Sequence, residues 1–103
     1  MTAPRFDELI HPGTRLSVVA LLASADWAEF AFLRDQLDLS DSALSKQLST
    51  LEDAGYVAIE RPLRDSRRRV RARLTEVGRA AFAGHVAALQ QIVKTADVDQ
   101  ALV

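Results

Sequence analysis

Seven arginines lie within thirteen consecutive positions of this chain, from Arg61 to Arg73. With Asp65 as its single acid, this segment has a formal charge of +6, whereas the chain as a whole is −1. A basic segment on an otherwise acidic chain predicts a polarised surface that binds phosphate groups. Arginines can also protect a sheet edge from aggregation, but one or two would suffice for that. We therefore expect phosphate contacts from Arg64, Arg67, Arg68, Arg69 and Arg71.

A second set of hydrogen-bonding side chains lies on one face of a helix predicted over residues 40–54. Leu44, Leu48 and Leu51 recur at helical spacing and predict the buried face of this helix. The opposite face carries small hydroxyl groups and one lysine, which suit a helix that enters a DNA major groove. An ordinary solvated face is the alternative, although such faces usually carry long Glu and Lys side chains. The candidate DNA contacts on this helix are Ser42, Ser45, Lys46, Gln47, Ser49 and Thr50.

Groups suited to catalysis or metal binding are few. The chain has no cysteine and only two histidines, His11 and His85, which lie far apart in the sequence. We expect His11 to cap or pack at a helix start and His85 to face the neighbours of the last helix, rather than the two sharing a metal. The neighbouring acids along the chain point in different directions on a helix, and no phosphate-binding loop or nucleophile motif occurs. The sequence therefore predicts no enzyme activity, no cofactor and no metal site.

Two helices joined by a tight turn precede the basic segment. The spacing of apolar residues predicts a short helix over 30–37 and then the helix over 40–54. Ser40 is a good N-cap for the second helix, and Gly55 can adopt the left-handed conformation that ends it. Arg34 is expected to face outward, where it contacts a phosphate or nothing at all. Together, residues 30–54 form a predicted helix-turn-helix.

A β-hairpin over 56–74 is predicted to follow these helices. Residues 56–63 and 69–74 alternate apolar and polar side chains as strands do, and 64–68 form the turn between them. One face of the second strand is apolar and the other is a row of arginines. An arginine-rich loop of this kind suits the backbone or the minor groove of DNA beside the helix.

The first and last predicted helices have more apolar surface than one small core needs. The first lies within 5–25, with Pro12 near its start, and the last within 75–94, with Thr75 as its N-cap. We predict that the spare surface is buried in a two-fold homodimer built from these two helices. The tail, 95–103, either frays or extends the dimer contact.

These elements occur in the order of a winged helix-turn-helix domain. The run LSDSALSKQLSTLEDAGYV, the basic hairpin and LTEVGRAAF resemble transcriptional regulators of the MarR and ArsR type. The opening FDELIHPGTRLSVVALL is similar to that of a group of short winged-helix DNA-binding proteins, so the resemblance covers Phe6 to about Ile92. It implies a mainly α fold with a small antiparallel β-hairpin, written α-α-(β)-α-β-β-wing-α, and a minor third strand near Trp27–Glu29. Many ArsR-type regulators sense metals through cysteines, which this chain lacks.

The chain, residues 1–103, is expected to form one domain and to bind double-stranded DNA as a sequence-specific transcriptional regulator. A homodimeric repressor that occupies a pseudo-palindromic operator is favoured, because no further domain is present to recruit polymerase. The alternative is a winged-helix protein-interaction module whose arginines bind an acidic partner. No apolar run predicts a membrane span and no signal peptide is evident, so a cytoplasmic protein is expected. A small-molecule effector remains open, since a pocket for one could be lined by Trp27, Phe30, Phe32 and Phe82, which also suit an ordinary core.

Overall fold

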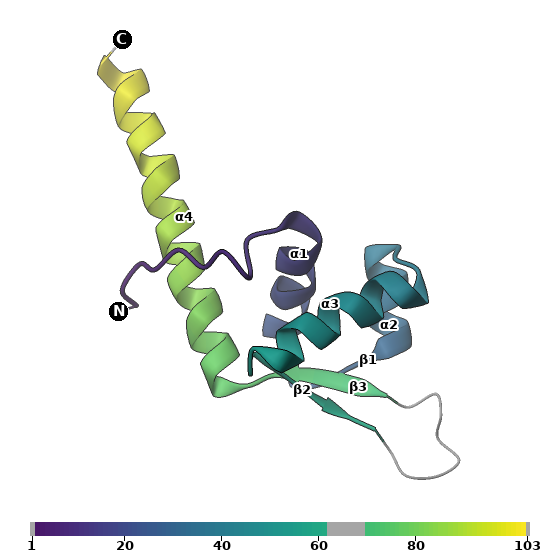
Figure 1. Cartoon of the computed structure of the whole chain (residues 1–103). Coiled ribbons are helices and arrows are strands. Elements are labelled where there is room, and N and C mark those ends of the chain that lie inside the picture. Colours follow the sequence, from purple (N-terminus) through teal and green to yellow (C-terminus); the bar gives the residue numbers. More distant parts are fainter. Residues whose placement is uncertain (1, 62–69, 103) are drawn as a thin grey trace.

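The computed structural model describes residues 2–61 and 70–102, which form four helices and three short strands (Figure 1). This confirms the mainly α fold with a small antiparallel sheet. The order written from the resemblance, α-α-(β)-α, is wrong in one place: the minor strand lies between the first two helices, at the residues predicted for it, so the order is α-β-α-α-β-β-α. The elements are α1 (Gly13–Ala23), β1 (Ala28–Glu29), α2 (Phe30–Leu37), α3 (Asp41–Asp53), β2 (Val57–Glu60), β3 (Arg71–Leu74) and α4 (Glu76–Leu102).

The three strands form an antiparallel sheet with β3 in the middle, in the order β1-β3-β2. Ala72 lies opposite Ala28 on one side and opposite Ile59 on the other. Ala72 and Leu74 are buried. Because side chains alternate along a strand, Arg71 and Arg73 lie on the other face of the sheet. Arg71 and Arg73, the two described members of the predicted row of arginines, are therefore separated from the core by the sheet itself.

The core lies between the helices and the inner face of this sheet. Leu44, Leu48 and Leu51 of α3 are all buried, as their spacing predicted, and they belong to the same cluster as Val19 and Leu22 of α1. Burying a leucine side chain contributes about 1.5 to 3 kcal/mol to folding. One face of α3 is thus buried in the core, and its opposite face is exposed to solvent.

Both ends of α3 are fixed by local hydrogen bonds and backbone geometry. The hydroxyl of Ser40 accepts a hydrogen bond from the backbone N–H of Ala43 at 3.1 Å, which confirms Ser40 as the N-cap. Gly55 has a φ of 81°, so it ends the helix in the predicted left-handed conformation. Asp38, in the turn between α2 and α3, also has a positive φ of 53°, which aspartate tolerates better than most residues. This turn joins the two helices within three residues.

The first helix is shorter than the segment 5–25 that was expected to contain it. Pro12 is its N-cap and α1 begins at Gly13. The preceding residues turn back on Asp7, whose carboxylate oxygen Oδ1 accepts the backbone N–H groups of Leu9 and Ile10 at 2.9 and 3.1 Å. These bonds satisfy the backbone of a turn rather than that of a helix, because Asp side chains compete locally for backbone donors.

Residues 3–11 form an N-terminal strap that crosses α4 (Figure 1). The backbone N–H of Arg5 donates to the carbonyl of Gly84 at 2.9 Å. Two side chains hold Asp7: the backbone N–H of Asp7 donates to Nδ1 of His85 at 2.9 Å, and its Oδ2 accepts the hydroxyl of Tyr56 at 2.7 Å. His85 is fully buried beneath the strap. The strap therefore connects the last helix to the end of α3.

The last helix begins at the predicted cap and continues well past the rest of the fold. The hydroxyl of Thr75 accepts the backbone N–H of Gly78 at 3.0 Å, as an N-cap does. The helix reaches Leu102 and so includes nearly all of the tail. It projects away from the other elements (Figure 1) and gives the molecule a longest dimension of 61 Å. Within the described ranges, none of the helices combines the length and the apolar character needed to cross a membrane.

Candidate nucleic-acid interface

The face of α3 opposite the core is open to solvent. Ser42, Ser45, Lys46 and Ser49 are all exposed, whereas Leu44, Leu48 and Leu51 are buried on the other side. The sequence prediction of a face with hydroxyl donors and one cation therefore agrees with the position of these four side chains. Such a face can donate hydrogen bonds to phosphate oxygens and to the base edges of a major groove.

Gln47 and Thr50 are half-buried at the edges of this face, and both already have partners. The side-chain oxygen of Gln47 accepts a hydrogen bond from Nε of Arg15 at 2.8 Å. The hydroxyl of Thr50 donates to the carbonyl of Lys46 at 3.0 Å. Since adenine is read by both the oxygen and the nitrogen of a glutamine amide, the contact with Arg15 leaves Gln47 less suited to that role than its sequence position indicated.

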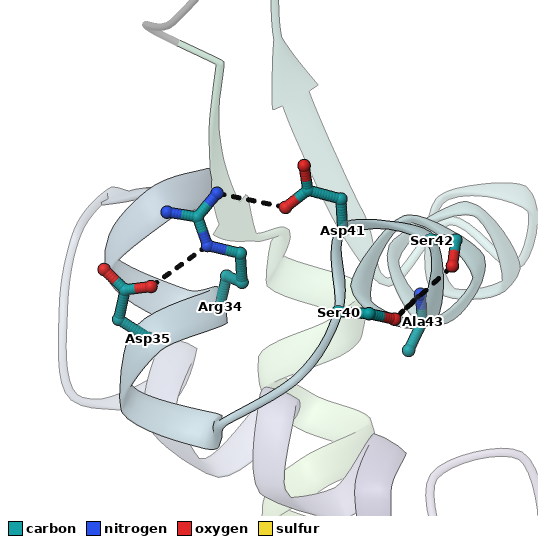
Figure 2. A network of polar contacts seen from close by, with 6 residues as sticks. All are labelled: Arg34, Asp35, Ser40, Asp41, Ser42 and Ala43. Atoms are coloured by element: carbon teal, nitrogen blue, oxygen red, sulfur yellow. Dashed lines mark hydrogen bonds and ion pairs between the residues drawn. The ribbon is translucent and has the colours of Figure 1, made fainter.

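Arg34 joins α2 to the first turn of α3 (Figure 2). Its Nε and Nη1 donate to the carboxylates of Asp35 and Asp41, each at 3.0 Å. The hydrogen bond with Asp35, followed by that with Asp41, raises the pKa of Arg34 above its ordinary value. Arg34 was expected to face a phosphate or nothing, and it instead pairs with Asp35 of α2 and with Asp41 at the start of α3.

An open groove of about 500 Å³ runs between α2, α3 and the sheet. Ser45 and Ser49 of α3 line it, so the groove is continuous with the face described above. Of the aromatic residues considered for an effector pocket, Phe30 lines this groove, Phe82 packs against the core, and Phe32 is 48% exposed. These three side chains therefore do not converge on one pocket. The full lining is Phe30, Ala31, Arg34, Asp41, Ser45, Leu48, Ser49, Ile59, Arg61 and Val70.

Trp27, the fourth of those aromatic residues, lies under two arginines of β3. The guanidinium carbons of Arg71 and Arg73 are 4.4 and 5.3 Å from the centroid of the indole ring. Arg71 also donates from Nε to the carboxylate of Glu60, its neighbour across the sheet. Arg71 was predicted to contact DNA, and in the free protein it is held against the sheet by a ring and an acid.

The other predicted contacts of the basic hairpin, Arg64, Arg67, Arg68 and Arg69, lie outside the described residues. Arg61, at the end of β2, is described and forms an ion pair with Glu52 in the last turn of α3. Its Nη1 and Nη2 lie 3.4 Å from the two carboxylate oxygens of Glu52. The base of the hairpin is therefore tied to the helix that carries the exposed serines.

The two histidines lie together although 74 positions separate them in the sequence. Nδ1 of His11 is 3.2 Å from Nε2 of His85, and Nδ1 of His85 accepts the N–H of Asp7. His85 therefore carries its ring proton on Nε2, which leaves no lone pair on that atom for a metal. Among residues 2–61 and 70–102, no group of three or more His, Cys, Asp or Glu side chains could hold a metal ion.

Comparison with known proteins shows which family has this architecture. Residues 14–93 match the family model described as a winged helix DNA-binding domain. An uncharacterized protein of Methanocaldococcus jannaschii is 29% identical over 87 residues, which are 84% of this chain and 95% of that protein. The fold is similar to that of a transcriptional regulator homologue from Pyrococcus horikoshii, with a TM-score of 0.82, 21% identity and coverage of 88% and 90% of the two chains.

It is also similar to the transcriptional regulator PA4135, with a TM-score of 0.70, 23% identity and coverage of 82% of this chain and 61% of that one. Both solved structures were described as regulators of transcription or their homologues, and at these identities they show a shared fold. The family model covers most of the chain, including α1, both helices of the helix-turn-helix, the sheet and most of α4. The chain therefore belongs to the winged helix DNA-binding domain family, and its fold is similar to that of the solved transcriptional regulators named above.

Proposed function

We propose that this protein is a homodimeric repressor that binds a pseudo-palindromic site in double-stranded DNA. In this proposal α3 enters the major groove, and the arginine-rich segment 61–73 contacts the backbone or the adjacent minor groove. The observation that carries the proposal is the exposed face of α3, where three serines and a lysine are uncovered while the leucines opposite are buried.

The charge distribution supports the same surface. Arg61 is anchored to Glu52 of α3, so the basic segment starts beside the exposed face of that helix. The groove between α2, α3 and the sheet lies at this junction and is lined by Ser45, Ser49 and Arg61. Lys46 is the one lysine of the helix, and it is exposed. A negatively charged duplex would therefore meet cations from two adjacent elements.

Among the predicted contacts, Gln47 takes a different part in this proposal. Arg15 holds its side-chain oxygen, so Gln47 orients α3 through α1 and leaves base contacts to its neighbours. The serine hydroxyls accept and donate, which makes them poor discriminators of individual bases. Sequence preference then depends on Lys46 and on the shape of the DNA under the basic segment.

Apolar residues of α4 supply the proposed dimer contact. Ile92 and Val93, in the second half of α4, are 58% and 60% exposed. The helix α1 contributes its exposed side, which carries Gly13, Ser17 and Ala20. A dimer would present two copies of α3 to one duplex, and half-sites about one helical turn apart would then be required.

Binding of a fluorescent, random-sequence duplex at two salt concentrations tests this function. We expect binding at about 50 mM salt and affinity lower by at least about a hundredfold at about 200 mM, because each released counterion contributes to the salt dependence. The alternative, a module for an acidic protein partner, predicts no binding to the duplex even at the lower salt. Absence of binding there would remove the proposed function.

A pair of lysine variants makes the test specific to α3. Lys46→Ala should weaken binding and reduce the slope of log affinity against log salt by about one for each protomer. Lys94→Ala removes the same charge from an exposed position on α4 and should leave both quantities unchanged. Equal losses in the two variants would point to a general charge effect and against α3. Selection from a random oligonucleotide pool should then return sequences with two-fold symmetry.

A further inference from the structure

The contact between the N-terminal strap and α4 is built from two neutral imidazole rings. Nδ1 of His85 accepts the backbone N–H of Asp7 at 2.9 Å, so that nitrogen carries a lone pair. Nε2 of His85 therefore carries the proton and donates it to Nδ1 of His11 at 3.2 Å. The protonation of the three ring nitrogens in these bonds is therefore fixed: Nδ1 of His85 and Nδ1 of His11 are unprotonated, and Nε2 of His85 is protonated. A proton added to Nδ1 of either ring would point at the hydrogen that this nitrogen now accepts.

The surroundings of His85 also oppose a positive charge. Its ring is fully buried, and the ring of Phe6 lies 4.7 Å from both imidazoles. Burial and then the neighbouring charge of His11 lower the pKa of His85, and Asp7 opposes this only in part. The Asp7 carboxylate already accepts bonds from the hydroxyl of Tyr56 and from two backbone N–H groups of the strap.

We propose that His11 and His85 form a latch that holds the strap on α4 and opens when either ring gains a proton. The titratable groups that face His85 are His11 and Asp7 of the strap. Tyr56, just before β2, is linked to them through its hydrogen bond to Asp7. Opening breaks the bond from Asp7 to His85, and it loosens the neighbouring bond from the Arg5 N–H to the Gly84 carbonyl.

The strap is connected to the DNA-facing helix through one arginine. Nη1 of Arg15 donates to the carbonyl of Leu9 in the strap at 2.8 Å, and Nε of the same side chain donates to Gln47 of α3 at 2.8 Å. Ile10 is fully buried and stays in the core, but the turn that carries Leu9 is held by Oδ1 of Asp7, so opening at Asp7 shifts the Leu9 carbonyl that Arg15 contacts. Opening of the latch therefore changes the hydrogen bonding of the Arg15 side chain that contacts Gln47, on the edge of the candidate nucleic-acid interface.

The direction of the pH effect follows from the lowered pKa of His85. The open strap leaves His85 near its ordinary value of 6.5, so the open form binds a proton more tightly than the closed form. The latch is at full strength above about pH 6.5 and weakens by up to about tenfold for each pH unit below it, until the lowered pKa is reached. The sequence contains no other histidine, so no other side chain has its ordinary pKa in this range.

Amide hydrogen exchange of the full chain at about pH 7.5 and about pH 5 tests the latch. We expect the protection factor of the Asp7 N–H, corrected for intrinsic exchange, to be lower at about pH 5 than at about pH 7.5. The N–H of Leu44, which bonds to Ser40 in α3, should keep its protection and so exclude global unfolding. An Asp7 amide whose protection is the same at both pH values would overturn the proposal.

His85→Asn provides a matched variant, because its amide oxygen can replace Nδ1 as the acceptor and cannot titrate in this range. Protection of Asp7 should then be independent of pH, and a fall equal to that of the unmodified chain would contradict the latch. If this variant folds poorly, NMR titration of the two imidazole rings in the unmodified chain provides the check. A His85 midpoint at or above 6.5 would also contradict the proposal.

The link to α3 is read from the side-chain amide of Gln47. Its NMR signals should move with the same midpoint as the loss of Asp7 protection and stay fixed in His85→Asn. Signals that stay fixed in the unmodified chain while the strap opens would overturn the link through Arg15. Neither measurement contains DNA, so these results are independent of whether the proposed DNA binding holds.

Discussion

Tyr56 is the residue whose chemistry is most directly changed by the fold. Its hydroxyl donates to Oδ2 of Asp7 at 2.7 Å, across 49 positions of sequence. This hydrogen bond, together with partial burial and the charge of Asp7, raises the pKa of Tyr56 above its ordinary value of 10.0. A phenol that must stay protonated to hold the strap contributes stability below pH 10, and this contribution is lost as the pH rises through the raised pKa.

An alkaline absorbance titration reads this effect from one residue, because the chain has a single tyrosine. We expect a midpoint above 10.0 in the folded protein and a return toward that value in urea. Asp7→Asn should lower the folded midpoint, since the amide removes the charge that favours the protonated phenol. A folded midpoint at or below that of the unfolded chain would contradict the contact.

For single residues, the sequence correctly predicted the features that depend only on nearby residues of the same helix. The buried leucines of α3, its cap at Ser40 and its exposed serines all follow from spacing and cap chemistry. The contacts that change the interpretation join residues far apart in the chain. Arg15 and Gln47 are 32 positions apart, and Asp7 and His85 are 78 positions apart. Periodicity contains no information about such pairs, so the engagement of Gln47 and the meeting of the histidines could not be predicted.

At the scale of the elements, the contact between α4 and the segment after α3 explains why residue 78 is a glycine, which helix propensity alone does not explain. A Cβ built on Gly78 would lie 2.1 Å from the carbonyl oxygen of Tyr56. The same carbonyl accepts the backbone N–H of Thr75 at 3.0 Å, so it cannot easily move away. The absence of a side chain at Gly78 therefore lets α4 start directly against the sheet.

Gly78→Ala and Gly84→Ala form a matched pair on this helix. An interior Gly→Ala change stabilises a helix by about 1 kcal/mol when space is available. At Gly84 the nearest atom to a new Cβ is 3.4 Å away, so we expect a free energy of unfolding that is unchanged or higher. At Gly78 the clash with backbone should instead lower it by about 1 to 3 kcal/mol.

Urea unfolding of the two variants beside the unmodified chain measures the difference. Equal effects at the two positions would mean that the contact with Tyr56 is not as close as described. The sequence alone does not distinguish the two positions, because it shows only that each glycine lies inside a helical pattern. What separates them is the element packed against each one, which is a tertiary property.

The same reasoning explains which elements were placed well. The helices 30–37 and 40–54 were predicted within one residue of α2 and α3, because caps and stops mark their ends. The hairpin strands are shorter than the ranges 56–63 and 69–74, although their pairing is as predicted. The first helix starts beside Pro12 as predicted, and the part of the segment 5–25 before it is a turn held by the Asp7 side chain.

At the scale of the whole molecule, the long α4 carries apolar side chains that the rest of the described fold does not cover. The middle of this helix is crossed by the strap, which contacts Gly84 and the fully buried His85. Its distal part carries Ile92 and Val93, which have no cover within the described residues. Large apolar side chains that stand together in solvent favour association. A second copy of α4 would bury them by a two-fold contact.

Ile92→Glu tests the proposed dimer by sedimentation. Burying this side chain stabilises an interface by about 1.5 to 3 kcal/mol, and about 1.4 kcal/mol corresponds to a tenfold change in Kd. With two copies in the contact, we expect the dimer Kd to rise by at least about tenfold. Gln91→Glu adds the same charge at an exposed polar position beside it and should have little effect. A dimer unaffected by Ile92→Glu would place its interface elsewhere.

The position of Trp27 has an experimental consequence. It is the only tryptophan of the chain, and it lies beneath Arg71 and Arg73 of β3, at the end of the arginine-rich segment 61–73. Indole emission depends on nearby charge and solvent, so any event that draws these guanidinium groups toward another anion alters the fluorescence of this ring. The protein thus contains an intrinsic optical reporter at the root of its most cationic segment, and ligand engagement there can be followed without attaching a dye.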